Sequence, residues 1–230
     1  MSDRSGVLAQ LARVVAGTAS DSPLPLRMCR ACVSILGVDG GSITLAYDSP
    51  QRVTLCSTDN VAERLEDLHE VVGEGPSLWA YEHGMAVTTA VDGGADHRWP
   101  QFAESVKREI GQLSIYAVPI IPESEIVGVS TFYLRRQSSL LIDEETCRLL
   151  INAVGVALVA DPDLTDDGSA GSWASRDKVS QATGMVMAQL GLRPEDALAL
   201  LRAHAYADNT SLNGVSQAVI ERRLDFAGTD

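Results

Sequence analysis

The sequence predicts an α+β fold in which an antiparallel sheet is flanked by helices, followed by an all-α domain of three short helices. In residues 1–160, β-rich runs bounded by turn residues alternate with helical patterns. Residues 176–230 instead carry apolar residues only at helical spacing. We therefore expect two domains, 1–160 and 176–230, joined by a linker at 161–175.

The first part of the N-terminal domain contains two helical patterns followed by a strand pair. Apolar spacing predicts helices at Val7–Ala16 and Leu26–Leu36. Two β-rich runs, Ser42–Tyr47 and Val53–Thr58, are separated by Asp48-Ser49-Pro50, and this spacing favours an antiparallel pair.

The second part of this domain alternates helices and strands and ends in a hairpin and a long helix. Pro122 and Glu123 lie between the two strands of the predicted hairpin. The elements expected here are helices Val61–Val72, Ser77–His83 and Phe102–Ile110, strands Ala86–Thr89, Leu113–Ile120 and Ile126–Leu134, and helix Asp143–Val159 with Leu149, Ala153 and Val156 on one face.

The C-terminal residues predict three helices with clear ends. The first, Arg176–Leu190, is closed by Gly191, which suits the left-handed conformation after a helix. The second begins at Pro194, a residue that fits the first helical position. Ser211 is the expected N-cap of the third.

The stretch 161–175 predicts a linker. It combines Pro162, Gly168 and Gly171 with several Ser and four Asp, without apolar periodicity. Because such a linker does not fix domain orientation, we expect contacts across a dimer to do so.

Composition and charge exclude several classes of protein. The chain is 45% hydrophobic and 21% charged, which excludes a largely disordered protein. Its polar start and the lack of a run of roughly 18 apolar residues predict a cytoplasmic protein that does not span a membrane. The net charge is −13, but residues 173–230 hold six Lys/Arg and seven Asp/Glu, a net charge of −1. Most of the charge that would repel a nucleic acid therefore lies outside the C-terminal domain.

Cysteine and histidine patterns give little support for metal or redox chemistry. Cys29 and Cys32 form a C-x-x-C inside an apolar helical pattern, with no second pair to complete a metal site. We interpret them, and Cys56 and Cys147, as structural. His97, in a Gly-rich loop, is the one histidine considered for a haem site. No phosphate-binding loop or nucleophile motif is found, so we expect no cofactor, no metal and no catalytic residues.

The C-terminal residues resemble an ANTAR domain, the RNA-binding module named for antitermination regulators. The resemblance rests on "RDKVSQATGMVMAQLG", "EDALALLRAHA" and "LNGVSQAVIERRL". It implies RNA-binding residues at Arg176, Lys178, Thr183 and Arg202. Many ANTAR domains have Lys at the position of Thr183, which we expect to be exposed, so one cationic contact is absent here.

The N-terminal domain resembles a GAF domain, a sensory module, in "VDGGSITL", "GEGPS", "DHRWPQF" and "SIYAVPI…IVGVSTFYL". A GAF domain followed by an ANTAR domain implies a signal-responsive antitermination regulator. The implied partners are paired stem-loops in a nascent transcript, an unknown small-molecule signal and a second copy of the chain.

Two alternatives remain open at this stage. One is a protein-binding or dimerisation regulator without RNA contact, which the missing cation favours. The other is an enzyme, because some GAF-fold proteins reduce free methionine sulfoxide through cysteine chemistry.

Overall fold

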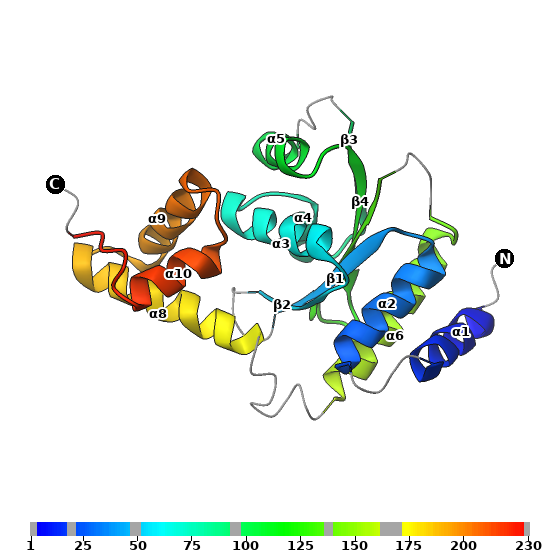
Figure 1. Cartoon of the computed structure of the whole chain (residues 1–230). Helices are drawn as coiled ribbons and strands as arrows, with labels where there is room; N and C mark the ends of the chain where they lie inside the picture. The colour runs from blue at the N-terminus through cyan, green and yellow to red at the C-terminus, as the bar shows by residue number, and fades with distance from the viewer. Residues whose placement is uncertain are drawn as a thin grey trace.

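The computed structural model describes residues 4–17, 22–46, 52–92, 98–135, 140–161 and 172–227, with the backbone alone for residue 4 and residues 172–176. Figure 1 shows two parts, a sheet with helices on both faces and a smaller helical bundle beside it. We call residues 4–161 the N-terminal domain and residues 172–227 the tail. Among the described residues, every helix is too short or too polar to span a membrane.

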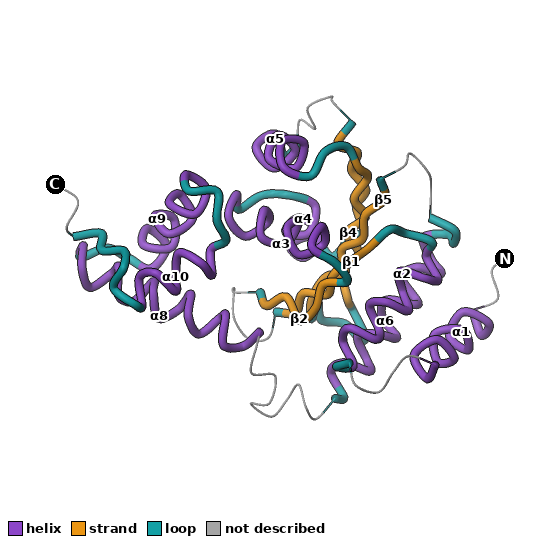
Figure 2. The backbone as a smooth tube through the Cα atoms, viewed as in Figure 1, coloured by secondary structure: helices purple, strands orange, loops and turns teal. Residues whose placement is uncertain are grey.

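The N-terminal domain is built on a five-stranded sheet of order β2-β1-β5-β4-β3 (Figure 2). Every neighbouring pair is antiparallel. The predicted antiparallel sheet is therefore confirmed, including both predicted hairpin pairs. The strands are β1 (Gly40–Leu45), β2 (Val53–Ser57), β3 (Val87–Val91), β4 (Leu113–Ile120) and β5 (Gly128–Leu134).

One face of the sheet is covered by α2 (Leu24–Leu36) and α6 (Glu144–Val159), with α1 (Arg4–Gly17) packed outside them. The buried apolar side chains of these helices meet those of β1, β4 and β5 in one core. Asp143 caps α6 because its Oδ1 accepts a hydrogen bond from Thr146 N at 2.9 Å. This core is continuous between the sheet and the helices α2 and α6.

The other face is covered by α3 (Asn60–Val72), α4 (Pro76–His83) and α5 (Pro100–Glu109). Asp59 caps α3 by accepting hydrogen bonds from Val61 N and Ala62 N. The N-terminus of α5 is capped from a distance, because Glu74 Oε1 accepts from Gln101 N at 2.8 Å and from Phe102 N at 3.0 Å. The second core lies between these helices and the sheet.

The tail consists of α8 (Ser172–Leu190), α9 (Pro194–Ala207) and α10 (Leu212–Ile220). Gly191 ends α8 with a φ of 66°, and Ser211 Oγ accepts from Gly214 N at 3.1 Å. Both predicted helix ends are therefore confirmed. α8 begins at Ser172 rather than Arg176, so residues 172–175 of the predicted linker are helical; residues 162–171 lie outside the described residues.

Candidate nucleic-acid interface

The tail has a small core that fixes the directions of its side chains. Six apolar residues from the three helices are fully buried: Ala182, Val186, Ala197, Leu201, Ala205 and Val219. One residue of this core, Val71, comes from α3 of the N-terminal domain. The tail is thus a bundle that packs on the N-terminal domain beside it.

Thr183 does not occupy the exposed position expected from the sequence. It is 8% exposed, and its Oγ1 donates a hydrogen bond to Val179 O at 2.7 Å, one turn earlier in α8. The expectation of an exposed contact residue is therefore wrong for this side chain. The reason is that the helix turns Thr183 into the bundle beside Ala182.

The remaining candidates on α8 are Lys178 and Arg176. Lys178 is half-buried and lies near Glu221 at the end of α10. The pKa of Glu221 is lowered by hydrogen bonds from Gln217 and Arg223, with a smaller contribution from the charge of Lys178. Arg176 lies in α8, but its side chain is outside the described part of the structure.

Arg202 lies on the face of α9 that is turned toward the N-terminal domain. It is half-buried, and burial lowers the pKa of its guanidinium, an effect that the negative charge of Glu70 on α3 opposes. A Cβ on Gly73, just beyond α3, would be 3.8 Å from its Nη1. Within the described residues, no group accepts a hydrogen bond from its buried Nε.

Three further contacts join the tail to the N-terminal domain. Val71 of α3 is 6% exposed and packs in the tail's core. Arg64 Nη2 donates to Asn209 Oδ1 at 3.1 Å. The guanidinium of Arg108 lies 5.9 Å from the ring centre of Tyr206, a distance at which a cation–π attraction is weak but present.

Between these contacts lies an open hollow of about 420 Å³. It is lined from the N-terminal domain by Val71, Val72 and Gln101 and from α9 by Arg202, Ala203 and Tyr206. The interface is therefore incompletely packed. We call it the α3–α9 interface.

The three predicted contact residues whose side chains are described do not form one patch. Arg202 faces α3, Lys178 lies near α10, and Thr183 is inside the bundle. Sequence reasoning missed Tyr206, which is 46% exposed and lies one turn after Arg202. A guanidinium and an aromatic ring at this spacing form a surface on which an unstacked base can lie. The i, i+4 spacing of Arg202 and Tyr206 was the signal that could have identified it.

The N-terminal domain has a polar interior between the sheet and α3. Glu66 is 3% exposed; its Oε1 accepts from Ser42 Oγ at 2.8 Å and its Oε2 accepts from Thr44 Oγ1 at 3.4 Å. His69 Nδ1 lies 3.8 Å from Glu66 Oε2. These groups link α3 directly to β1.

His69 is held as a neutral ring in this interior. Its Nε2 accepts from Ser77 N at 3.3 Å, and its ring stacks on Phe102 with centroids 4.3 Å apart. Burial lowers its pKa to about 4, although the charge of Glu66 opposes this shift. Gly75 is required here, because a Cβ at this position would lie 2.6 Å from the His69 ring.

The four cysteines are free and gather in the core beneath the sheet. Cys29, Cys32 and Cys147 are buried and Cys56 is half-buried. Burial raises the pKa of the Cys32 thiol, and it raises that of Cys147 to about 12. Such thiols are poor nucleophiles. In the described part of the chain, no three His, Cys, Asp or Glu side chains come together as metal ligands; His97 lies outside it.

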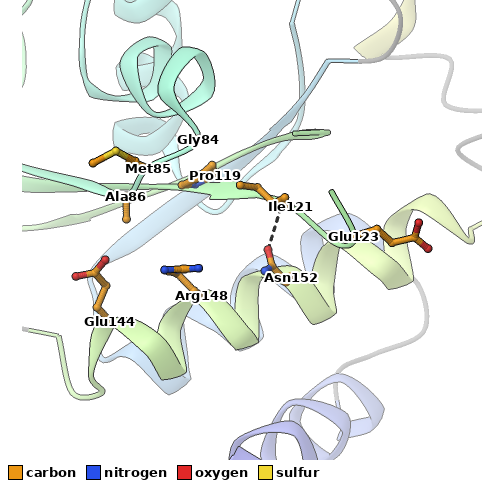
Figure 3. A pocket seen from close by; sticks show the side chains of 9 residues that line it. All are labelled: Gly84, Met85, Ala86, Pro119, Ile121, Glu123, Glu144, Arg148 and Asn152. Carbon is orange, nitrogen blue, oxygen red and sulfur yellow. Dashed lines mark hydrogen bonds between the residues drawn. The ribbon is translucent and has the colours of Figure 1, made fainter. Parts of the chain in front are cut away.

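A second hollow, of about 360 Å³, lies between α6 and the end of β4 (Figure 3). Glu144, Arg148 and Asn152 line it from successive turns of α6, and Met85 lies across from them. Asn152 Oδ1 accepts from Ile121 N at 2.9 Å, which fixes α6 against the end of β4. The hollow offers both charges and an apolar side to a small molecule.

Comparison with known proteins gives one family match. Residues 172–220 match the family model of the ANTAR domain. The resemblance expected from the C-terminal residues is therefore confirmed. Comparison with curated proteins gives no significant match.

Three solved structures that resemble the chain contain GAF domains. The GAF domain of A. aeolicus nlh2 in an inactive state has 16% identity and a TM-score of 0.43, covering 66% of this chain and 90% of that one. The GAF domain of Acinetobacter phosphoenolpyruvate-protein phosphotransferase has 16% identity and a TM-score of 0.46, with coverages of 70% and 98%. The GAF domain/HD domain protein from Geobacter sulfurreducens has 12% identity and a TM-score of 0.42, with coverages of 69% and 97%.

Proposed function

We propose that the chain is a signal-responsive RNA-binding regulator of transcription antitermination. The observation that carries this proposal is the ANTAR match over residues 172–220, which covers all three tail helices. The tail binds the loops of paired stem-loops in a nascent transcript. The N-terminal domain receives a small-molecule signal, and the protein acts in the cytoplasm.

The chemistry of α9 supports RNA as the ligand. Arg202 supplies a guanidinium for a phosphate or base edge, and Tyr206 supplies a ring for stacking. Two other cations of the tail contribute less, since Arg193 pairs with Asp196 at 3.2 Å and Arg223 pairs with Glu221 at 2.6 Å. Recognition then depends on base stacking and loop shape more than on charge.

A homodimer is part of the proposal, because two tails are needed for paired stem-loops. Apolar side chains on the outer helices support this: Leu8 of α1 is 36% exposed, and Val156 and Val159 of α6 are 53% and 37% exposed. V156E is expected to give a folded monomer by light scattering that no longer prefers paired stem-loops. Ala153 is the poorer probe, because it also packs on the domain's own core.

The decisive experiment is crosslinking of the protein to RNA in cells, followed by sequencing of the bound fragments. The expected product is a set of leader transcripts with two adjacent stem-loops. A gel-shift assay with the recovered RNA then gives the affinity. Absence of any enriched RNA would favour the protein-binding alternative.

A cysteine-dependent sulfoxide reductase is the less favoured alternative. Its chemistry needs an accessible thiolate, whereas burial raises the pKa of Cys32 and Cys147. A hydrogen bond with Cys56, together with burial, raises the pKa of Cys29, so the three buried thiols stay protonated. An assay of free methionine sulfoxide reduction is expected to show no turnover.

A further inference from the structure

We propose that the N-terminal domain holds the tail in a closed state, in which α3 covers the surface of α9 that contacts RNA. This inference rests on the proposed function and concerns the regulation of the same surface. RNA competes with α3 for Arg202 and with Arg108 of α5 for Tyr206. A signal that loosens the α3–α9 interface frees the tail for RNA.

The first argument is that the contact residues of α9 are already in use. Arg202 is acted on by Glu70 of α3. One turn later, the ring of Tyr206 lies 5.9 Å from the guanidinium of Arg108 on α5. Asn209, just beyond α9, is bonded to Arg64 of α3. Side chains one turn apart on a helix share one face, and that face contacts one partner at a time. An RNA loop bound to this face of α9 would therefore displace α3.

The second argument is the charge on α3. Its last turns carry Glu66, Asp67 and Glu70, and the charge of Glu70 acts on Arg202. Of these carboxylates only Glu70 acts on Arg202, because Glu66 faces the sheet and Asp67 pairs with Arg64. Burial raises the pKa of Glu70 to about 7, so Glu70 carries part of a negative charge at neutral pH. Glu70 therefore takes the place beside Arg202 that an RNA phosphate would take.

The third argument is that the interface can open without loss from either core of the N-terminal domain. Val71 packs in the tail's core and belongs to neither core of the N-terminal domain. The hollow of about 420 Å³ shows that the two surfaces are incompletely packed. An incompletely packed interface contributes little free energy to docking of the tail. A ligand that binds the open and the docked states with different affinities can therefore shift the equilibrium between them.

The fourth argument is that α3 connects the interface with the interior of the N-terminal domain. Glu66 and His69 point to the sheet and are bonded to β1 and α4, respectively. Arg64 and Val71, on the other side of the same helix, contact the tail. A change in packing against β1 or α4 therefore reaches the tail through one rigid element.

The closed state is measured first without RNA, in the full chain. In V71C, the introduced thiol is shielded only while the tail is docked. We expect slow labelling by a maleimide in the free protein, with the wild-type chain as control for the native Cys56. Fast labelling of the free protein would overturn the closed state while leaving RNA binding by the wild type intact.

Competition is measured next with the two-stem-loop RNA recovered by crosslinking. Saturating RNA is expected to accelerate labelling of V71C at least about tenfold, because bound RNA holds the tail open. Unchanged labelling at saturation would show that RNA binds elsewhere and would overturn the inference.

The affinity test uses V71D, which places a carboxylate in the interface. We expect this variant to bind the RNA about tenfold tighter than the wild type, as when a competent fraction of about one tenth becomes the whole population. L141D is the matched control, because Leu141 is 73% exposed and lines neither hollow. Equal affinity of V71D, L141D and wild type would overturn the inference; failure of all three to bind any RNA would overturn the proposed function itself.

Discussion

The N-terminal domain and the tail differ in how they are held together. The first has two cores, one on each face of a five-stranded sheet, and both consist of its own residues. The tail has one small core, and this core includes Val71 from the other domain. A small bundle buries a smaller fraction of its surface and is marginally stable. The comparison indicates that the tail depends on its neighbour for part of its stability, whereas the N-terminal domain does not depend on the tail.

The largest expected effect that tests this difference is local unfolding of the tail. Leu201 is fully buried, so Leu201→Ala should lower the unfolding free energy of the tail by about 2–5 kcal/mol. Thermal circular dichroism should then show a helical transition below that of the sheet. Leu158→Ala, equally buried in α6, is the matched control and should shift the transition of the N-terminal domain. A single transition that both variants move equally would contradict two units of different stability.

The next effect concerns the interior of the N-terminal domain and its response to acid. The pKa of His69 is lowered to about 4, so the folded domain excludes a proton that the unfolded chain binds below about 6.5. The stabilising contribution is therefore complete above pH 6.5 and is lost as the pH falls toward 4, by about 3 kcal/mol. Asp67 and Glu70, whose pKa values burial raises to about 6 and about 7, change the stability in the opposite direction over this range in both proteins. Urea unfolding at pH 7, 5.5 and 4.5 should therefore show that the wild type loses more stability on acidification than His69→Gln. An equal slope in both proteins would assign the acid sensitivity to other groups.

A smaller effect is expected in the tail for Thr183→Lys. A lysine at this buried position has no space for its longer side chain, and burial would desolvate its charge. We expect the tail to lose about 1–3 kcal/mol of stability, with no gain in RNA affinity. Thr183→Ser keeps the hydroxyl that donates to Val179 O and is the matched control. Tighter RNA binding by a stable Thr183→Lys protein would show that this side chain reaches the surface.

The smallest expected effect is on RNA affinity alone. Arg202→Ala should weaken binding by about 1–3 kcal/mol, as expected for loss of one base-edge or phosphate contact. Because Arg202 also contributes to the closed state, the loss is best measured in the V71D background, where the tail is already free. Arg193→Ala removes an exposed arginine that is paired with Asp196 and is the control. Equal affinities of the two variants would remove Arg202 from the contact surface.

Local sequence patterns predicted most of the elements. The β4 bounds agree with the predicted strand, and the Ser211 cap and the Gly191 end were read from single residues. These features depend on interactions within one turn or one strand, which the sequence contains directly. The cap of α5 was not predictable in this way, because Glu74 reaches it from a separate loop.

The candidate site was predicted less well than the fold. The helical period places Thr183 beside Ala182, but it does not say which neighbour covers that side, so its burial was missed. The same limit applies to Arg202, whose place on α9 was correct but whose contact with α3 was unforeseen. Contacts between residues more than a hundred positions apart leave no local pattern.

By itself, the sequence determined the α+β class, the helical tail and its ANTAR character, because apolar period, caps and motif residues act locally. Only the tertiary structure decided that α3 carries two different surfaces. Glu66 and His69 face the sheet, while Arg64 and Val71 meet the tail. The physical reason is that burial and charge at an interface depend on which two elements meet, and that choice is made by the packing of the whole chain.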